Sequence, residues 1–312
     1  MHFLSQYGLF LLKALTIVIS LLLAFAGILA LGKKPKPQLE ITPLNKQYDE
    51  LKQRLFHEIK DEKIKKKKDK NKEKNPSLYV LDFNGDIKAS QVEALRETIT
   101  AVLAVANPKD EVVIRLESPG GAVNGYGLAA SQLQRIRDKE IPLTVCIDKI
   151  AASGGYLMAC VANQIIAAPF AIIGSIGVVA QMPNFHRWLE KNNIDVELLT
   201  AGEYKRTLTV FGENTEKGRK KFQEDLEKIH EAFRNYVLKN RNKLNIDEVA
   251  TGEHWLAEDA FSLKLVDSLK TSDTYLIEKM DHFNVFKMAV HGKKSLVEKI
   301  MHPAAKLLSP WA

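Results

Sequence analysis

The sequence is poor in cysteine: Cys146 and Cys160 are the only two among 312 residues. Two cysteines exclude a disulfide scaffold and a multi-cysteine zinc module, and both lie in apolar stretches that suit small core residues. The HExxH, Walker A and GxGxxG patterns are also missing, so we expect no metal, nucleotide or other cofactor. With 46% hydrophobic and 27% charged residues, the chain is not disordered throughout.

The basic charge is confined to one part of the chain. The formal net charge is +7, but residues 1–76 hold 16 Lys and Arg against 8 Asp and Glu, whereas residues 77–312 hold 29 against 30. A nucleic-acid-binding protein carries its basic patch on the folded part. We therefore expect no nucleic-acid partner.

A long apolar run lies near the start of the chain. Residues 14–32 contain no charged side chain, and at about 1.5 Å per residue such a helix spans roughly 28 Å, close to the hydrocarbon core of a bilayer. We predict an N-terminal transmembrane helix, with residues 1–32 as membrane anchor and residues 14–32 in contact with lipid. A buried helix and a cleaved signal peptide are the alternatives. Ala24-Phe25-Ala26 resembles a cleavage site, but the apolar residues continue beyond the usual length of a signal-peptide core.

Residues 33–76 are rich in proline and lysine and are predicted to form a charged linker. Prolines interrupt any helix at its start, and residues 44–59 have the spacing of a short amphipathic helix. Residues 60–74 hold nine lysines against four acids, which is typical of a solvated spacer; contact with anionic lipid headgroups is the alternative. The lysines that follow the apolar run favour a cytoplasmic location for the rest of the chain.

Residues 77–312 alternate between strand-like and helix-like segments, with a C-terminal extension expected from about residue 281. This alternation predicts an α/β domain with a mostly parallel sheet. No charged residue lies in 150–185, and we expect residues 159–180 to form buried core rather than a second membrane span. The expected strands are Leu78–Asp82, Val112–Leu116, Leu143–Ile147, Ile165–Ala168, Ile176–Val179 and Val196–Thr200. The expected helices are Gln91–Ala106 with a capping box of Ser90 and Glu93, Tyr126–Lys139, Gly154–Ala162 and about Thr215–Lys243.

Three short motifs are candidates for chemistry. ESPGG at 117–121 lies between a strand and a helix, where glycines let backbone amides face a ligand; a tight turn is the alternative. AASGGY at 151–156 places a serine at a helix N-terminus, which suits a nucleophile beside oxyanion-binding amides, or a simple helix cap. GEYKRT at 202–207 contains a lysine. A lysine acts as general base only when its surroundings favour the neutral amine, and is otherwise a solvated surface residue.

These motifs together resemble the signal peptide peptidase A family of serine proteases. The matching segments are SPGG at 118–121, AASGGY at 151–156, GSIGV at 174–178 and GEYKR at 202–206. The similarity covers residues 77–280, includes the apolar N-terminal run, and is greatest to a branch of bacterial inner-membrane proteases. It implies a ClpP/crotonase-like spiral of ββα units that assembles into rings. Glu117 departs from the family, in which asparagine is common at that position.

The resemblance also implies roles for individual residues. Ser153 matches the nucleophile, and Lys205 matches the general base that takes its proton. The serine and lysine of one site can come from adjacent subunits in this family, so a chain with one catalytic domain would need a homo-oligomer. Gly120 or Gly121, together with the amide of Gly154, matches the oxyanion-binding position. Ser175 matches the hydroxyl that helps to orient the lysine.

The sequence therefore favours a membrane-anchored serine endopeptidase that hydrolyses peptides or unfolded polypeptides near the bacterial inner membrane, signal-peptide remnants among them. The resemblance favours a periplasmic catalytic domain, whereas the lysine pattern favours the cytoplasmic side. Two alternative functions are a crotonase-type acyl-CoA enzyme and a catalytically silent oligomeric membrane scaffold. A Ser-His site is a further alternative, and the histidines that could supply it are His186, His230 and His254.

Overall fold

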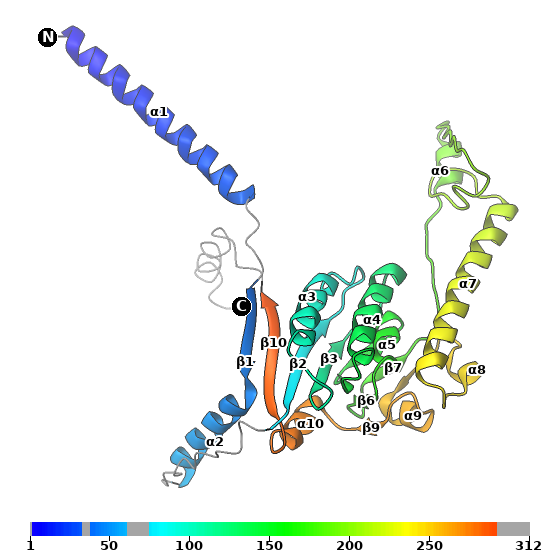
Figure 1. Ribbon diagram of the computed structural model, residues 1–312. Coiled ribbons are helices and arrows are strands. Elements are labelled where there is room, and N and C mark those ends of the chain that lie inside the picture. Colours follow the sequence, from blue (N-terminus) through cyan, green and yellow to red (C-terminus); the bar gives the residue numbers. More distant parts are fainter. Residues whose placement is uncertain (1, 33–37, 61–74, 292–312) are drawn as a thin grey trace. The chain divides into compact units, whose positions relative to one another are not determined.

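The computed structural model describes residues 2–32, 38–60 and 75–291 (Figure 1). The chain divides into two compact units, Met1–Glu40 with Val290–Ala312, and Ile41–Ala289. In the first unit, α1 spans His2–Gly32 and contains the run predicted to cross the membrane. Among the described residues, no helix combines the length and apolar character that a membrane crossing requires. The predicted span over residues 14–32 is thus not confirmed, and most of the lysine-rich part of the linker lies outside the described residues.

The second unit is built on a largely parallel sheet, as the alternating pattern predicted. Its strand order is β1-β10-β2-β3-β4-β6-β9, and every pair from β10 to β9 runs parallel. A smaller sheet joins β5, β7 and β8. The strands are β1 (Gln38–Pro43), β2 (Ser77–Asn84), β3 (Glu111–Glu117), β4 (Leu143–Ile147), β5 (Ile150–Ala152), β6 (Gln164–Ala167), β7 (Ile172–Gly174), β8 (His254–Leu256), β9 (Ser268–Leu269) and β10 (Asn284–His291).

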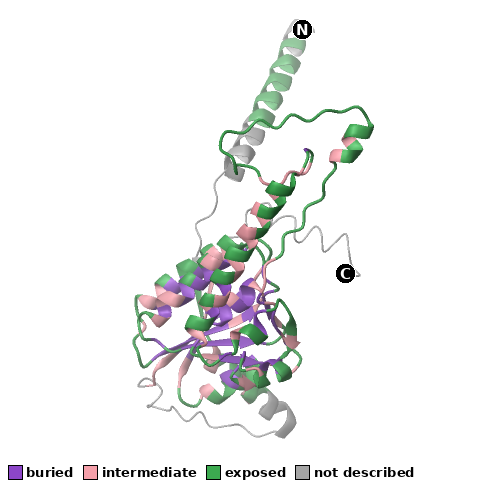
Figure 2. Ribbon diagram, turned by 90° about the vertical axis from the view of Figure 1, so that its right-hand side faces the viewer, coloured by how far each residue is buried: buried purple, intermediate pink, exposed green. Residues whose placement is uncertain are grey.

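Helices bury both faces of the main sheet. Successive side chains of a strand point to opposite faces, so Leu81 and Phe83 of β2 pack among residues of α3, α4 and α5. Leu78 and Val80 pack on the other face with residues of α10. Figure 2 shows the buried residues gathered on the sheet and on the helix faces against it. The helices of this unit are α2 (Leu44–Lys60), α3 (Val92–Leu103), α4 (Val123–Arg137), α5 (Gly154–Ala159), α6 (His186–Lys191), α7 (Glu216–Asn240), α8 (Ile246–Val249), α9 (Ala257–Ser262) and α10 (Ser272–Lys279).

The uncharged segment 159–180 belongs to the core over most of its length, as expected. Its residues in β6 and β7 include Ile165, Ile166 and Ile173, each fully buried. The predicted capping box is wrong: Gln91 is the N-cap of α3 and makes no side-chain cap bond. The amide of Ser90 instead donates to the carboxylate of Asp86.

The stretch between β7 and α7 differs most from prediction. Neither Ile176–Val179 nor Val196–Thr200 forms a strand. We call residues 179–211 the apolar arm, because many of its large apolar side chains are exposed; Val179 and Leu199 are each 90% exposed. Figure 2 shows most of this stretch as exposed. The apolar pattern that suggested strands therefore belongs to a surface segment.

The predicted linker and the predicted C-terminal extension both contribute residues that contact the main sheet. The helix predicted over 44–59 is confirmed as α2. Asn45 near its start donates to the carbonyls of Met280 and Phe283 and accepts from the amide of Val285, at 3.2, 3.1 and 2.6 Å. β10, within the expected C-terminal extension, pairs along β2 from Asn284 onward.

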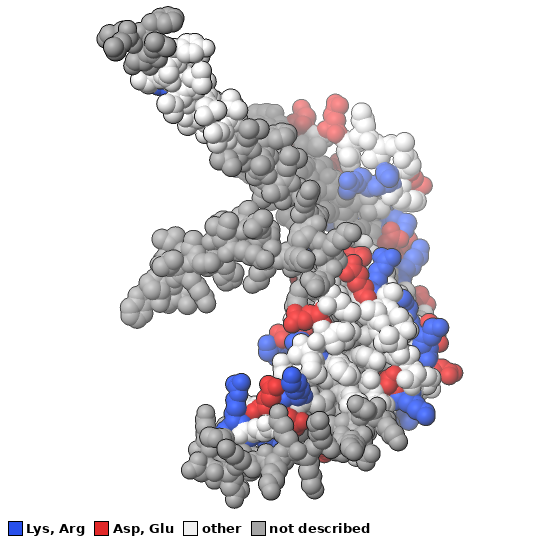
Figure 3. Space-filling model, turned by 60° about the vertical axis from the view of Figure 1, so that its left-hand side comes forward, with Lys and Arg blue, Asp and Glu red and all other residues white. Residues whose placement is uncertain are grey.

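On the face in Figure 3, basic and acidic side chains are interspersed.

Candidate active site

Ser153 occupies a strained turn between β5 and α5. Its backbone has φ 51° and ψ −119°, a combination that side-chain-bearing residues rarely adopt and that often marks functional sites. The amide of Ser153 donates to the carbonyl of Gly174 at 2.8 Å, which ties the turn to β7. The predicted nucleophile therefore lies at a fixed strand-to-helix turn, with a partly exposed side chain.

The loop after β3 packs directly against this turn. Ser118 pairs with Ala151 in an isolated parallel bridge, and its carbonyl accepts from the amide of Ala152 at 3.0 Å. Gly120 has φ 92°, and a Cβ atom there would lie 2.7 Å from Cβ of Ser153. The close approach of the two segments thus requires glycine at position 120.

The sequence leaves Gly120 and Gly121 as alternatives for the oxyanion pocket, and the structure distinguishes them by the hydrogen bonds of their amides. The amide of Gly120 donates to Oγ of Ser118 at 3.1 Å. Within the described chain, the amides of Gly121 and Gly154 have no such acceptor. Gly154 is the first residue of α5, where amides lack an acceptor within the helix. Among the three predicted glycines, Gly121 and Gly154 are therefore the two whose amides have no acceptor within the described residues.

A cavity of about 1240 Å³ opens beside Ser153. Much of its wall is apolar, which suits a ligand with aliphatic side chains. Ser175 also lies in the wall; it has φ 53°, and its amide donates to the carbonyl of Glu253 at 2.5 Å. The cavity brings together the predicted site residues Gly120, Gly121, Ser153, Gly154 and Ser175 with Ile87, Val123, Tyr126, Leu157, Val178, Val179, Lys228, Ile229, His230, Phe233 and Tyr236, among others.

Lys205 is not among the residues that line this cavity. It lies in the apolar arm, is exposed, and its amide donates to the carbonyl of Gly202 at 3.1 Å. Its neighbour Tyr204 lies beneath the ammonium groups of Lys217 and Lys221, 5.9 and 5.7 Å from the ring centre. A single chain thus places the predicted nucleophile and the predicted base in different surroundings.

The three histidines are also distinguished by their positions. His230 of α7 lines the cavity, and its Nε2 lies 3.1 Å from the carbonyl oxygen of Ile176. His186 and His254 do not line it. Sequence reasoning missed Tyr126 as a site residue, because an aromatic residue on a helix face is usually core and its position beside Gly154 depends on the fold.

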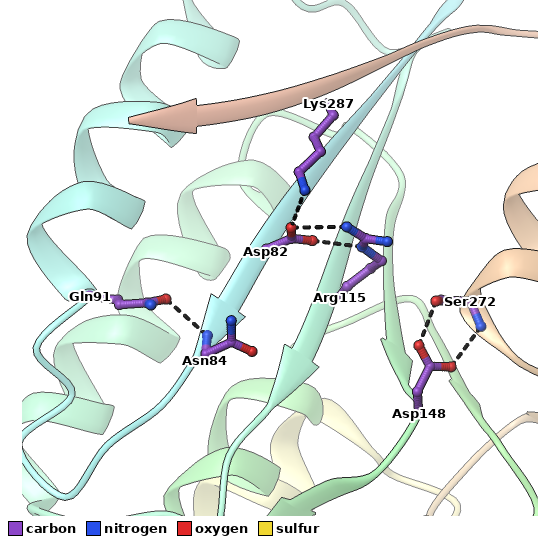
Figure 4. A network of polar contacts seen from close by, with 7 residues as sticks. All are labelled: Asp82, Asn84, Gln91, Arg115, Asp148, Ser272 and Lys287. Atoms are coloured by element: carbon purple, nitrogen blue, oxygen red, sulfur yellow. Dashed lines mark hydrogen bonds and ion pairs between the residues drawn. The ribbon is translucent and has the colours of Figure 1, made fainter. Parts of the chain in front are cut away.

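A second cavity, of about 300 Å³, lies at the carboxyl ends of β2, β3 and β4. Asp82 in its wall lies between Arg115 and Lys287, at 2.6 and 2.8 Å (Figure 4). Burial opposes ionisation of Asp82, but the hydrogen bonds from the two cations outweigh it and lower its pKa. Glu117, the departure from the family pattern, pairs with Lys149 at 3.0 Å in the same wall. These pairs tie strands together and offer no nucleophile.

The fold and the larger cavity together are typical of one class of protein. A parallel α/β sheet, a strained serine at a strand-to-helix turn and open amides beside it are typical of hydrolases that attack a carbonyl group. Comparison with known proteins specifies the class. Residues 2–133 match the family described as Peptidase family S49 N-terminal, and residues 135–285 match Peptidase family S49. The chain belongs to peptidase family S49.

Two relatives of similar length, each about half identical to this chain, support this assignment. "Probable protease SohB" of Haemophilus influenzae is 50% identical over 95% of this chain and 91% of its own. "Probable protease SohB" of Buchnera aphidicola subsp. Schlechtendalia chinensis is 49% identical over 89% of this chain and 100% of its own. Among solved structures, a mutant of the membrane-bound stomatin-specific protease 1510-N in complex with a substrate peptide matches with a TM-score of 0.45 and 17% identity, over 73% of this chain and 99% of that one.

Proposed function

We propose that the protein is a membrane-anchored serine endopeptidase of the SohB type, with Ser153 as nucleophile and Lys205 as general base. The observation that carries the proposal is the strained turn at Ser153, which lies in a large apolar cavity together with the open amides of Gly121 and Gly154. Family membership supports peptidase chemistry, and the geometry supports a serine nucleophile beside two amides that have no acceptor within the described chain.

The reaction follows from these groups. Oγ of Ser153 attacks the carbonyl carbon of the scissile peptide bond while Nζ of Lys205, as the neutral amine, takes the hydroxyl proton. The negative charge that develops on the carbonyl oxygen is stabilised by the amides of Gly121 and Gly154. The lysine then returns the proton to the leaving amine, and water hydrolyses the acyl-enzyme by the same route.

The lysine is proposed to come from an adjacent subunit. Lys205 lies in the apolar arm, whose exposed side chains include Trp188 at 62% and Leu199 at 90%. Scattered exposed apolar residues are common, but a concentration of large ones in one segment marks an interaction surface. Insertion of the arm into a neighbouring copy would bury these side chains and could bring Lys205 to the cavity of that copy. A homo-oligomer would then form the complete dyad.

The remaining parts of the proposal concern fold plan, location and substrate. The strand pairs β4–β5 and β6–β7 each contribute one strand to the main sheet and one to the smaller sheet, which supports a ClpP/crotonase-like spiral of ββα units. The uncharged run at residues 14–32 supports an anchor in the bacterial inner membrane. The apolar cavity wall supports peptides or unfolded segments with aliphatic side chains, including signal-peptide remnants, as substrates.

Cleavage of an unfolded polypeptide by the detergent-solubilised protein tests the dyad. Ser153→Ala and Lys205→Ala should both reduce cleavage to background while assembly is kept. Ser131→Ala and Arg206→Ala serve as matched controls, because Ser131 lies on the exposed side of α4 and Arg206 is the neighbour of Lys205. Product masses measure the outcome. A Ser153→Ala variant with full activity would refute the proposal and favour a crotonase-type enzyme.

Mixing the two inactive variants tests the origin of the lysine. If Ser153 and Lys205 meet across subunits, an equimolar mixed assembly contains intact pairs at about a quarter of its sites, so activity should return to roughly that fraction of wild type. If each chain supplies its own pair, no mixture regains activity. The separately assembled variants, combined without subunit exchange, provide the control.

A further inference from the structure

We propose that Tyr126 and Ser118 are positioning residues that hold the amides of Gly121 and Gly154 at the separation an oxyanion requires. This inference rests on the proposed function, because it concerns the same site. It adds two side chains to the site: Ser118, which is not part of the cavity wall, and Tyr126, which lines the cavity but contacts none of the reacting atoms in the proposed mechanism. Both side chains are fully buried.

Hydrogen-bond geometry fixes the direction of a chain of bonds through these residues. Oη of Tyr126 donates to the carbonyl oxygen of Asp86 at 2.8 Å, and a phenol has a single proton to donate. At the 2.6 Å contact between Ser118 Oγ and Tyr126 Oη, the serine must therefore be the donor. Oγ of Ser118 is then left as acceptor for the amide of Gly120 at 3.1 Å.

This chain of bonds connects the end of β2 to the glycine loop after β3. Burial raises the pKa of Tyr126, so the phenol keeps the proton on which the direction depends. Gly85, at the β2 end, has no space for a side chain: a Cβ there would lie 2.3 Å from Oη of Tyr126 and 2.4 Å from Oγ of Ser118. The loop that carries Gly121 is therefore held from behind by a closely packed, directional network.

The ring of Tyr126 holds the other amide. A Cβ atom on Gly154 would lie 2.4 Å from Cγ of the Tyr126 ring, so the backbone at the start of α5 packs directly against this ring. The hydroxyl of Tyr126 thus acts on the loop of Gly121, and its ring acts on Gly154. One side chain contacts both structures that carry the proposed oxyanion-binding amides.

Removing the hydroxyl should affect the transition state more than substrate binding. Without it, Ser118 loses its acceptor, and its Oγ is free to rotate and release the amide of Gly120. The adjacent amide of Gly121 then loses its fixed position. Because oxyanion-binding amides act on charge that develops only in the transition state, kcat should fall while KM changes little.

Steady-state kinetics of Tyr126→Phe and Ser118→Ala, in the full assembled protein, test the inference. We expect kcat to fall about tenfold to hundredfold, with KM within about twofold of wild type. The affinity of a peptide aldehyde, which forms a tetrahedral adduct with a serine nucleophile, should fall by a similar factor. Tyr156→Phe is the matched control: Tyr156 is also fully buried, and its hydroxyl donates to the carbonyl of Leu265 at 2.9 Å.

The outcomes separate this inference from the proposed function. If Ser153→Ala is inactive but Tyr126→Phe keeps kcat within about twofold of wild type, the positioning role is overturned and the nucleophile stands. If Tyr156→Phe loses kcat as strongly as Tyr126→Phe, the loss reflects general destabilisation, and the positioning role is overturned. If the assembled wild type cleaves nothing, or Ser153→Ala remains active, both the proposed function and the inference fail.

Discussion

At the scale of single residues, the close approach of Gly120 to Ser153 limits what the site tolerates. Gly120→Ala would place a Cβ 2.7 Å from Cβ of Ser153 on a backbone with φ 92°. We expect activity to fall by at least about a hundredfold, because displacement of either segment misaligns the proposed nucleophile Ser153 and the proposed oxyanion-binding amides. The free energy of unfolding should fall by about 1–2 kcal/mol or more from backbone strain alone. Peptide cleavage and urea denaturation measure the two effects.

Gly127→Ala is the control for this substitution. Gly127 lies within α4, and a Cβ there would point into open space beyond its own helix, so alanine should raise the free energy of unfolding by roughly 0.5–1 kcal/mol. Activity should not change. Equal losses of activity at positions 120 and 127 would contradict the claim that the contact with Ser153 matters.

Some of the site residues could be predicted from the sequence and others could not. Ser153, Gly120 and Gly154 lie in short motifs whose residue types indicate a tight turn before a helix. Tyr126 contacts Gly154 and, through its hydroxyl, Asp86, 40 positions earlier in the chain. No local pattern encodes such a contact, because it depends on the packing of α4 between two loops.

At the scale of secondary-structure elements, Asp82 connects three neighbouring strands of the main sheet. Its carboxylate accepts from Arg115 of β3 and Lys287 of β10. Asp82→Asn removes the charge and leaves both cations without it, so the free energy of unfolding at neutral pH should fall by about 1–3 kcal/mol. Urea denaturation of both proteins measures the difference.

The pH dependence of that difference has a definite sign. The pKa of Asp82 is lowered in the folded state, so its contribution is complete above the unfolded-state pKa of about 3.9 and is lost as the pH falls through the lower folded-state value. The gap between wild type and Asp82→Asn should therefore narrow below about pH 4. A gap that stays constant between pH 7 and acid conditions would contradict it. Asp281→Asn, at an exposed carboxylate, is the control.

The accuracy of the predicted elements follows from how the elements are buried. β2, β3 and β4 are buried on both faces, so their continuous apolar runs predict strands correctly. The segments at 176–179 and 196–200 are equally apolar but contain exposed residues such as Val179 and Leu199. A hydrophobic pattern alone does not show whether the residues that carry it lie in the core or on the surface of the folded chain.

At the scale of the whole molecule, the apolar arm should control assembly. Trp188→Glu places a charge on a side chain that is 62% exposed in the single chain. If the arm packs into a neighbouring copy, burying that charge is unfavourable, so the mass measured by light scattering should fall towards that of a monomer, and cleavage should fall with it. The fold itself should be unaffected.

Phe170→Glu is the control at this scale. Phe170 is 81% exposed but lies outside the arm, so its replacement should change neither mass nor cleavage. If Trp188→Glu keeps both the mass and the activity of wild type, the arm is not the assembly surface. If Trp188→Glu lowers the mass measured by light scattering but keeps full activity, cleavage does not require assembly.

The pairing of β10 with β2 determines how late in synthesis the main sheet can be completed along this edge. β2 is the first strand of residues 75–291, and its neighbour β10 is the last, separated by about 200 residues. At a synthesis rate of about 5–20 residues per second, one edge of β2 waits roughly 10–40 s for its partner. An open strand edge invites pairing with other chains. This edge of β2 therefore stays open to pairing with other chains until residues 284–291 have been synthesised and pair with it.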